Sequence, residues 1–182
     1  MIRRTLVLGG ARSGKSAHAE GLVPADGAVT YVATSRRDPA DPEWTQRIAE
    51  HETRRPSCWT TVEAGSPETL CATLEDATEQ DPPVLVDDLG TWLTGVLDDA
   101  GAWDRDPVAL REVASHCDAL VAALRRCSAH VVLVSAEVGL GVVPGTRSGR
   151  LFRDELGAIN ARLAEECDSV VLLVAGVPLR LR

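Results

Sequence analysis

The sequence predicts a three-layer α/β fold in which helices cover both faces of a mostly parallel sheet. Short apolar runs rich in β-branched residues alternate with longer amphipathic stretches, as they do in successive β-α units. Aromatic residues make up only 3% of the chain, so the core is expected to consist of Val, Leu, Ala and Ile. Such side chains suit helices that pack on a buried parallel sheet.

Five apolar runs are the predicted strands, and six longer segments are the predicted helices. The strands cover residues 5–8, 28–33, 84–86, 130–135 and 169–174. The helices cover residues 15–22, 42–54, 67–79, 91–98, 107–126 and 149–166. At least one helix separates each strand from the next, which is the connectivity that parallel strands require.

The helix over 107–126 has the clearest pattern. Its apolar side chains recur at helical spacing and form one stripe, made of Leu110, Val113, Cys117, Leu120, Val121 and Leu124. We interpret this stripe as core packing against the sheet. Asp106 before Pro107 predicts an N-cap followed by a first-turn proline, and Ser66 before Pro67 predicts the same arrangement.

Length, charge and cysteine content restrict the class of protein. A chain of 182 residues with 45% hydrophobic residues suits one soluble domain over residues 1–182. The formal net charge of −8 argues against nucleic acid or an anionic membrane as a partner. The five cysteines never form a C-x-x-C pair, so neither a disulfide framework nor a zinc site is expected. No apolar run is long enough for a signal segment or a membrane span, and we therefore expect a cytoplasmic protein.

Residues 9–16 read GGARSGKS and match the phosphate-binding pattern G-x-x-x-x-G-K-[ST] between a predicted strand and a predicted helix. Glycines let backbone N–H groups approach a phosphate closely. Lys15, the single lysine of the chain, would neutralise the β and γ phosphates, and the Ser16 hydroxyl would ligate Mg²⁺. The sequence therefore predicts a P-loop NTPase whose phosphate site consists of Gly9, Gly10, Ala11, Arg12, Ser13, Gly14, Lys15 and Ser16.

A P-loop enzyme also needs an acidic residue at the end of a neighbouring strand. The apolar run 84–86 is followed by Asp87 and Asp88, and Asp87 is the first candidate for orienting Mg²⁺ through water. The alternative is that an aspartate here caps the helix that begins near Leu89. The two roles can fall to different members of the pair.

The segment 47–56 reads RIAEHETRRP and places His51 close to Arg54 and Arg55. A neutral imidazole is a competent nucleophile toward phosphorus, and the two arginines could neutralise anionic phosphates. Taken alone, however, a histidine on a charged helix is more often a solvated surface residue. This segment by itself therefore leaves both interpretations open.

Six motifs, in order along the chain, together resemble the bifunctional adenosylcobinamide kinase and adenosylcobinamide-phosphate guanylyltransferase family. They are GGARSGKS at 9–16, YVATS at 31–35, RIAEHETRRPSCWTTVEA at 47–64, VLVDDLGTWL at 84–93, EVGLGVVP at 137–144 and GRLFRDELGAINARLA at 149–164. The terminal AGVPLRLR also fits, so the resemblance extends from end to end.

The resemblance implies a cytoplasmic enzyme of cobalamin biosynthesis with a RecA-like P-loop fold, assembled as a homotrimer. Such an enzyme phosphorylates adenosylcobinamide with ATP or GTP, and then transfers GMP from GTP to adenosylcobinamide phosphate with release of pyrophosphate. By motif position, the catalytic residues are His51, which would carry GMP covalently, and Lys15. Mg²⁺ would be held by Ser16 and Asp87. Besides the P-loop, the family's nucleotide contacts fall on Ala33, Thr34, Ser35, Glu52, Thr53, Arg54, Arg55, Glu63 and Asp87.

Three positions depart from the family pattern. Glu52 stands where an arginine commonly follows the histidine, which removes a positive charge beside the proposed nucleophile. Ala136 replaces an asparagine that often precedes Glu-Val-Gly, and its lost hydrogen bond could alter the order of the following loop. Gly90 and Thr91 differ from the family pattern in the segment that follows the strand 84–86 and its aspartates.

Three other interpretations stay open at this point. The first is a small-molecule P-loop kinase without nucleotidyl transfer, in which His51 is structural. The second is a regulatory or scaffold protein that binds GTP without group transfer. A nucleic-acid module is the least favoured, because the chain is acidic and poor in aromatic residues.

The stretch 138–153 combines five residues of Gly and Pro with Arg147, Arg150 and Arg153. It reads as a mobile loop that runs into a helix and could cover the nucleotide. The alternative is a plain surface connection with solvated arginines.

Overall fold

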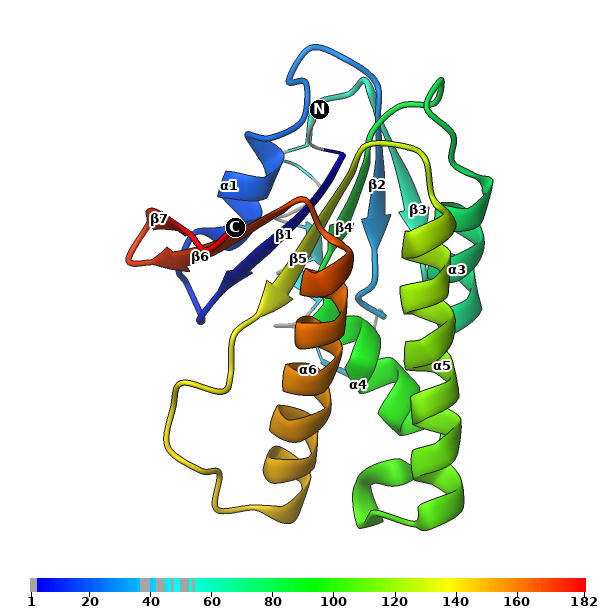
Figure 1. Cartoon of the computed structure of the whole chain (residues 1–182), viewed down its shortest axis with the longest axis vertical. Coiled ribbons are helices and arrows are strands. Elements are labelled where there is room, and N and C mark those ends of the chain that lie inside the picture. Colours follow the sequence, from blue (N-terminus) through cyan, green and yellow to red (C-terminus); the bar gives the residue numbers. More distant parts are fainter. Residues whose placement is uncertain (1–2, 37–39, 42–44, 47, 50–52, 54) are drawn as a thin grey trace.

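The computed structural model of the chain describes residues 3–36, 40–41, 45–46, 48–49, 53 and 55–182. Within these ranges, seven strands form one sheet in the order β3-β2-β4-β5-β1-β6-β7 (Figure 1). Every neighbouring pair is parallel except β6 and β7. The predicted α/β fold with a mostly parallel sheet is therefore confirmed.

The sheet contains two strands that the sequence did not predict. The seven strands are β1 (Arg4–Gly9), β2 (Val29–Ala33), β3 (Trp59–Glu63), β4 (Val84–Asp87), β5 (Val131–Ala136), β6 (Ser169–Val174) and β7 (Val177–Arg180). The unpredicted strands are β3 and β7, which form the two edges of the sheet. All four residues of β7 are exposed, and no residue of β3 is fully buried. Neither strand therefore carries the apolar run that marks a central strand.

The helices begin and end close to their predicted limits. They are α1 (Lys15–Glu20), α3 (Pro67–Asp76), α4 (Leu89–Asp99), the 3-10 helix η1 (Ala102–Asp104), α5 (Pro107–Arg126) and α6 (Arg147–Glu166). The predicted helix over 42–54 lies partly outside the described residues. Its described members Thr45, Gln46, Ile48, Ala49 and Thr53 are helical.

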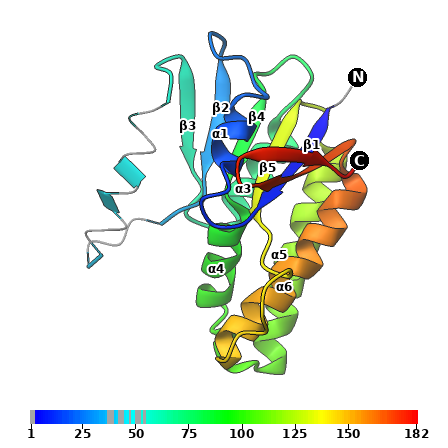
Figure 2. The same cartoon turned by 90° about the vertical axis from the view of Figure 1, so that its left-hand side faces the viewer.

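Helices cover both faces of the sheet, as predicted. Four of them, α3 to α6, pack on one face, and α1 packs on the other (Figures 1 and 2). Successive residues of the central strands alternate between the two faces: Leu6 and Leu8 belong to the larger hydrophobic cluster, whereas Val7 belongs to the smaller one. The alternation is the period-2 pattern of a strand buried on both sides.

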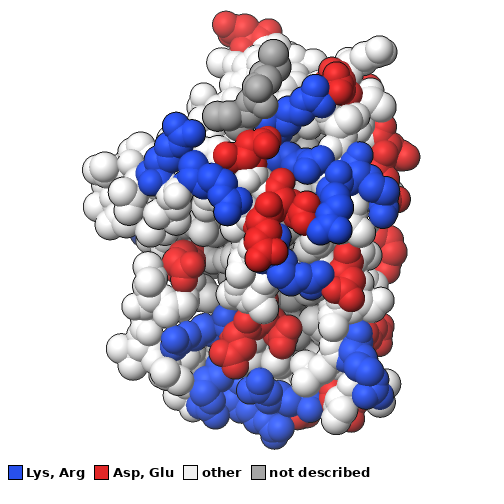
Figure 3. All heavy atoms as spheres, in the orientation of Figure 1, with Lys and Arg blue, Asp and Glu red and all other residues white. Residues whose placement is uncertain are grey.

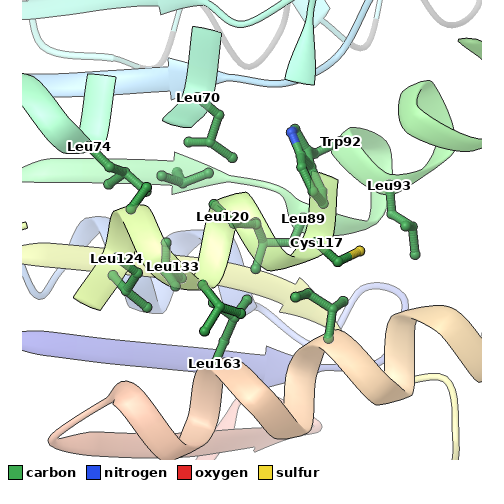
Figure 4. Packing of buried hydrophobic residues seen from close by; sticks show 14 of the residues in the cluster. Leu70, Leu74, Leu89, Trp92, Leu93, Cys117, Leu120, Leu124, Leu133 and Leu163 are labelled. Carbon is green, nitrogen blue, oxygen red and sulfur yellow. The ribbon is translucent and has the colours of Figure 1, made fainter. Parts of the chain in front are cut away.

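The larger cluster is a leucine-rich layer between the sheet and α3 to α6 (Figure 4). Labelled side chains in that figure include Leu70 and Leu74 of α3, Leu120 and Leu124 of α5, and Leu133 of β5. All five are fully buried. The stripe predicted on α5 is confirmed, because five of its residues are buried and Leu110 is packed against the same cluster.

Charged residues of both signs intermingle over the face formed by α5 and α6 (Figure 3). Ion pairs connect neighbouring helices there, among them Arg125 with Glu166 and Arg126 with Glu75. Exposed pairs of this kind contribute at most about 1 kcal/mol each. None of the helices in the described ranges has both the length and the apolar character to cross a membrane.

The two predicted N-caps differ in their hydrogen bonds. Asp106 caps α5, and its side chain accepts from the N–H groups of Val108 at 2.9 Å and Ala109 at 3.0 Å. Ser66 occupies the N-cap position of α3 but makes no side-chain cap bond; its hydroxyl lies 3.2 Å from the Thr69 hydroxyl. Only the aspartate therefore satisfies backbone donors at its helix end.

Replacing Asp106 with Ala is expected to lower the free energy of unfolding by about 1 kcal/mol, because two N–H groups lose their acceptor. Asp106→Asn should retain most of the stability, since an amide oxygen can accept the same bonds. Urea denaturation measures the change, with Glu112→Gln on the exposed side of α5 as the control. Equal midpoints for wild type and Asp106→Ala would contradict the cap.

Candidate nucleotide site

The residues predicted to bind nucleotide gather at the carboxyl ends of the parallel strands. The register pairs Ala33 of β2 with Asp87 of β4 on one side and with Glu63 of β3 on the other. The P-loop begins where β1 ends at Gly9. Open α/β sheets bind their ligands at this edge. The fold thus brings together candidates that lie more than 70 residues apart in the sequence.

The P-loop has the backbone that its glycines permit. Gly14 has a φ of 88°, a left-handed conformation that L side chains rarely adopt. A Cβ on Gly9 would lie 2.3 Å from the Ser13 Oγ, so the chain cannot carry a side chain there without moving. The loop is further held by the Gly176 N–H, which donates to the Ser13 carbonyl at 3.1 Å. Ser13 itself is buried, and its hydroxyl has no hydrogen-bond partner among the described residues.

The two residues predicted to hold Mg²⁺ are in contact. The Ser16 hydroxyl donates to Oδ1 of Asp87 at 3.2 Å. Hydroxyl and carboxylate oxygens suit Mg²⁺, which commonly takes one or two protein ligands and completes its shell with phosphate and water. The part of the chain that the structure describes holds no cluster of three or more His, Cys, Asp or Glu side chains that could enclose a metal. The donor set therefore fits a metal ion that arrives with a nucleotide.

The two neighbouring aspartates have different roles. Asp88 is the N-cap of α4, and its Oδ1 accepts from the Thr91 N–H at 2.8 Å. Asp87 instead faces Ser16. The Thr34 hydroxyl donates to the Asp88 carbonyl at 2.6 Å, which ties the end of β2 to the start of α4. The cap and the strand-end carboxylate proposed from the sequence are thus both present, on different residues.

Tyr31 is a member of the site that sequence reasoning missed. Its hydroxyl donates to Oδ2 of Asp87 at 2.9 Å, and its side chain is 2% exposed. Burial, together with the charge of Asp87, raises the pKa of Tyr31 well above its usual value, so the phenol keeps its proton. The signals available in the sequence were that Tyr31 is the single tyrosine and that it opens the YVATS motif at the end of a predicted strand.

The Tyr31 ring also contacts the segment before β3. The Arg55 guanidinium carbon lies 3.7 Å from the centroid of the Tyr31 ring. The ring of Trp59 stacks against the Tyr31 ring at a centroid distance of 6.2 Å. Arg55 Nη1 donates to the Thr61 hydroxyl at 3.1 Å. Its Nε is buried and has no hydrogen-bond partner among the described residues. Arg55, one of the predicted nucleotide contacts, is therefore held over the ring whose hydroxyl binds Asp87.

Three predicted site residues, namely His51, Glu52 and Arg54, lie outside the described residues. Thr53 is helical and exposed. The consequence of Glu52 for the charge of the site therefore stays a prediction.

The other two departures from the family pattern have neighbours that explain their tolerance. The Ala136 carbonyl accepts from Asn160 Nδ2 at 3.1 Å, so α6 supplies an amide at this strand end. The Thr91 N–H donates a hydrogen bond to the Asp88 side chain, and the Thr91 hydroxyl lies 2.6 Å from the Thr34 hydroxyl. A Cβ on Gly90 would be 3.3 Å from the Asp88 side chain, which is tight for any larger residue.

Two arginines of the stretch 138–153 bind the loop rather than extending into solvent. Arg150 Nη1 donates to the carbonyls of Pro144 and Gly145 at 2.9 Å each. Arg153 Nη2 donates to the Gly139 carbonyl at 3.2 Å. The loop starts beside the P-loop, because the Glu137 N–H donates to the Gly9 carbonyl at 3.1 Å. Whether it covers a nucleotide stays a prediction.

The sheet topology and the site together define a P-loop NTPase fold. Strand β5 lies between β1, which leads into the P-loop, and β4, which carries Asp87. A solved ATPase from the type III secretion system of pathogenic bacteria has a similar structure, with a TM-score of 0.56 at 12% identity. That match covers 94% of this chain and 51% of the ATPase, and it confirms the predicted fold alone.

Comparison with protein families gives the specific assignment. The family model described as cobinamide kinase / cobinamide phosphate guanyltransferase matches residues 5–181, and the chain belongs to this family of transferases. The bifunctional adenosylcobalamin biosynthesis protein CobP of Pseudomonas aeruginosa is 42% identical over 98% of this chain and 97% of its own length. The proteins named CobU of Salmonella typhimurium and Escherichia coli are 39% and 38% identical, each over 97% of this chain and 98% of their own. The family resemblance inferred from the motifs is therefore confirmed.

Proposed function

We propose that this protein phosphorylates adenosylcobinamide with ATP or GTP and then transfers GMP from GTP to adenosylcobinamide phosphate. The products are adenosylcobinamide-GDP and pyrophosphate. The observation that carries the proposal is the contact between Ser16 and Asp87, which joins a P-loop to a strand-end carboxylate in a chain of this family. The partners are the corrinoid and the nucleotides; nucleic acid is not among them.

In the first reaction, the triphosphate lies on the P-loop from Gly9 to Ser16. Lys15 neutralises charge on the β and γ phosphates, and the loop N–H groups bind their oxygens. The hydroxyl oxygen of the corrinoid attacks the γ phosphorus and loses its proton to solvent, the bond to the bridging oxygen breaks, and a nucleoside diphosphate leaves with the electron pair. Mg²⁺, held by Ser16 and Asp87, would supply further neutralisation of the phosphate charge.

In the second reaction, a nitrogen of neutral His51 attacks the α phosphorus of GTP. The bond from that phosphorus to the bridging oxygen breaks, and pyrophosphate leaves with the electron pair. Arg54 and Arg55 neutralise the departing anion. A phosphate oxygen of the corrinoid then attacks the same phosphorus and releases His51. Nucleotide contacts from Ala33, Thr34, Ser35, Glu52, Thr53 and Glu63 complete the proposed site.

The proposal includes a cytoplasmic location and a homotrimer. Both are supported by the resemblance of this chain to the family, and the acidic chain of ordinary globular composition agrees with them. We also propose that residues 1–182 act as one domain, because the seven strands of the described ranges form one sheet that runs from Arg4 to Arg180.

Product analysis tests the proposed function. Purified protein is incubated with Mg²⁺, GTP and adenosylcobinamide. The corrinoids are then separated, and their masses are measured by mass spectrometry. We expect the phosphate first and the GDP derivative later, with release of pyrophosphate. Accumulation of the phosphate alone would favour a kinase without nucleotidyl transfer. GTP binding with neither product would favour a regulatory protein.

The covalent step is expected to weaken as the pH falls from about 8 to about 5.5, because the protonated imidazole has no lone pair for attack. Initial rates of GMP attachment, measured by quenching at several pH values, give the profile. A flat profile across this interval would contradict nucleophilic attack by His51.

A further inference from the structure

We propose that Tyr31 is a positioning residue for both reactions, acting through its hydroxyl on Asp87 and through its ring on Arg55. This inference rests on the proposed function and assigns a role to a residue outside the predicted site. It links two parts of the site that are separate in the sequence, namely the phosphate and metal region and the arginine segment that follows His51.

The hydroxyl of Tyr31 fixes the direction of the Asp87 carboxylate. Ser16 donates to one oxygen of that carboxylate at 3.2 Å, and Tyr31 donates to the other at 2.9 Å. A metal ion would use a lone pair of the Ser16 hydroxyl, whose hydrogen still reaches Oδ1, so the second bond, from Tyr31 to Oδ2, is what fixes the rotation of the carboxylate. With one bond to each oxygen, the carboxylate plane is held in one orientation. Hydrogen bonds from a neighbouring side chain to a metal ligand commonly tune the affinity of the site for the metal.

The geometry of β2 permits this role. Tyr31 and Ala33 are two residues apart on one strand, so their side chains share a face of the sheet. Ala33 pairs directly with Asp87 in the neighbouring strand. The phenol therefore lies along the same face and reaches the carboxylate across the strand pair. Its burial excludes water that would compete for the bond.

The ring of Tyr31 acts on Arg55. A guanidinium 3.7 Å from the ring centroid makes a close cation–π contact, and Thr61 holds one of its terminal nitrogens. The Nε is buried and has no hydrogen-bond partner among the described residues, so the ring and Thr61 provide the contacts that hold this guanidinium. The ring thus holds a positive charge next to the nucleotide site, where the proposed second reaction needs it.

Two substitutions separate the hydroxyl from the ring. Tyr31→Phe removes only the bond to Asp87, whereas Tyr31→Leu removes the ring as well. Ser169→Ala is the control, since it deletes another buried hydroxyl at the opposite, amino-terminal end of a strand. Thermal unfolding of each variant is recorded first.

The first readout is the Mg²⁺ concentration that gives half-maximal binding of a non-hydrolysable GTP analogue. We expect Tyr31→Phe to raise this concentration about tenfold, while Ser169→Ala leaves it unchanged. Analogue affinity at saturating Mg²⁺ should stay within about twofold of wild type. An unchanged Mg²⁺ requirement in Tyr31→Phe would overturn the role of the hydroxyl.

The second readout is the rate of covalent GMP attachment at saturating Mg²⁺. Tyr31→Phe should be near the wild-type rate, and Tyr31→Leu should be roughly tenfold slower. Equal rates in the two variants would overturn the role of the ring. If Tyr31→Leu does not fold, Arg55→Gln replaces it, because it removes the charge and leaves the ring in place. If wild-type protein attaches no GMP, the proposed function fails at that step, and the Mg²⁺ requirement still decides the role of the hydroxyl.

Discussion

His51→Ala is expected to abolish covalent attachment of GMP. Wild-type protein incubated with Mg²⁺ and GTP, without corrinoid, should gain the mass of one GMP, whereas the variant should gain nothing. The reason is that no other group is proposed to attack the α phosphorus, so removal of the imidazole removes the intermediate. Intact-protein mass spectrometry measures the effect directly.

The control for this experiment is His116→Ala, which alters a histidine on α5 that pairs with Glu68. This variant should attach GMP as wild type does. His51→Ala should also keep phosphorylating adenosylcobinamide, because that step uses the P-loop and no histidine. A mass gain in His51→Ala would mean that another residue is the nucleophile. No gain in wild type, despite GTP binding, would favour the kinase without nucleotidyl transfer.

Lys15→Ala is expected to reduce phosphorylation of adenosylcobinamide by about 10²- to 10³-fold, as loss of one group that stabilises transition-state charge typically does. Lys15 follows the left-handed Gly14 and begins α1, at the end of the loop proposed to bind the phosphates. Lys15→Arg should not restore the rate, because a planar guanidinium cannot take the place of a compact ammonium in a closed loop. Initial rates with labelled GTP give kcat/KM for each variant.

Arg126→Ala on α5 is the matched control, since it removes an exposed cation that pairs with Glu75 away from the nucleotide site. Its kcat/KM should equal that of wild type. Lys15→Ala should unfold at the wild-type temperature, because the residue is partly exposed and its loss leaves no cavity. A Lys15→Ala enzyme with more than about a tenth of the wild-type rate would contradict the assignment of the phosphate site.

The central strands and the covering helices could be predicted because their periodicity comes directly from burial. The stripe on α5 follows helical spacing, and β1, β4, β5 and β6 are apolar runs. The edge strands could not be predicted in this way. Trp59–Glu63 and Val177–Arg180 are exposed along most of their length, and they form strands because a neighbour offers backbone partners.

The site shows the same division between local and non-local information. The P-loop is a local pattern, and its conformation at Gly14 follows from the residues that compose it. By contrast, the choice between Asp87 and Asp88 depends on which carboxylate faces Ser16 and which faces the first turn of α4. Tyr31 could not be assigned either, since only the register of β2 against β4 brings its hydroxyl to Asp87.

The two hydrophobic clusters differ in their relation to the site. Ala19 of α1, Tyr31 and Leu85 belong to the smaller cluster, and Ser16 and Asp87 lie on the same side of the sheet. The larger cluster beneath α3 to α6 holds most of the buried side chains and none of the residues that touch Asp87 in the contacts described above. Substitutions that increase thermal stability can therefore be sought in the larger cluster, away from the start of α4 and from Asn160, whose hydrogen bonds reach the carboxyl ends of the strands. Engineering of nucleotide or metal preference belongs on the α1 face, where the smaller cluster packs beside the residues proposed to bind the phosphates.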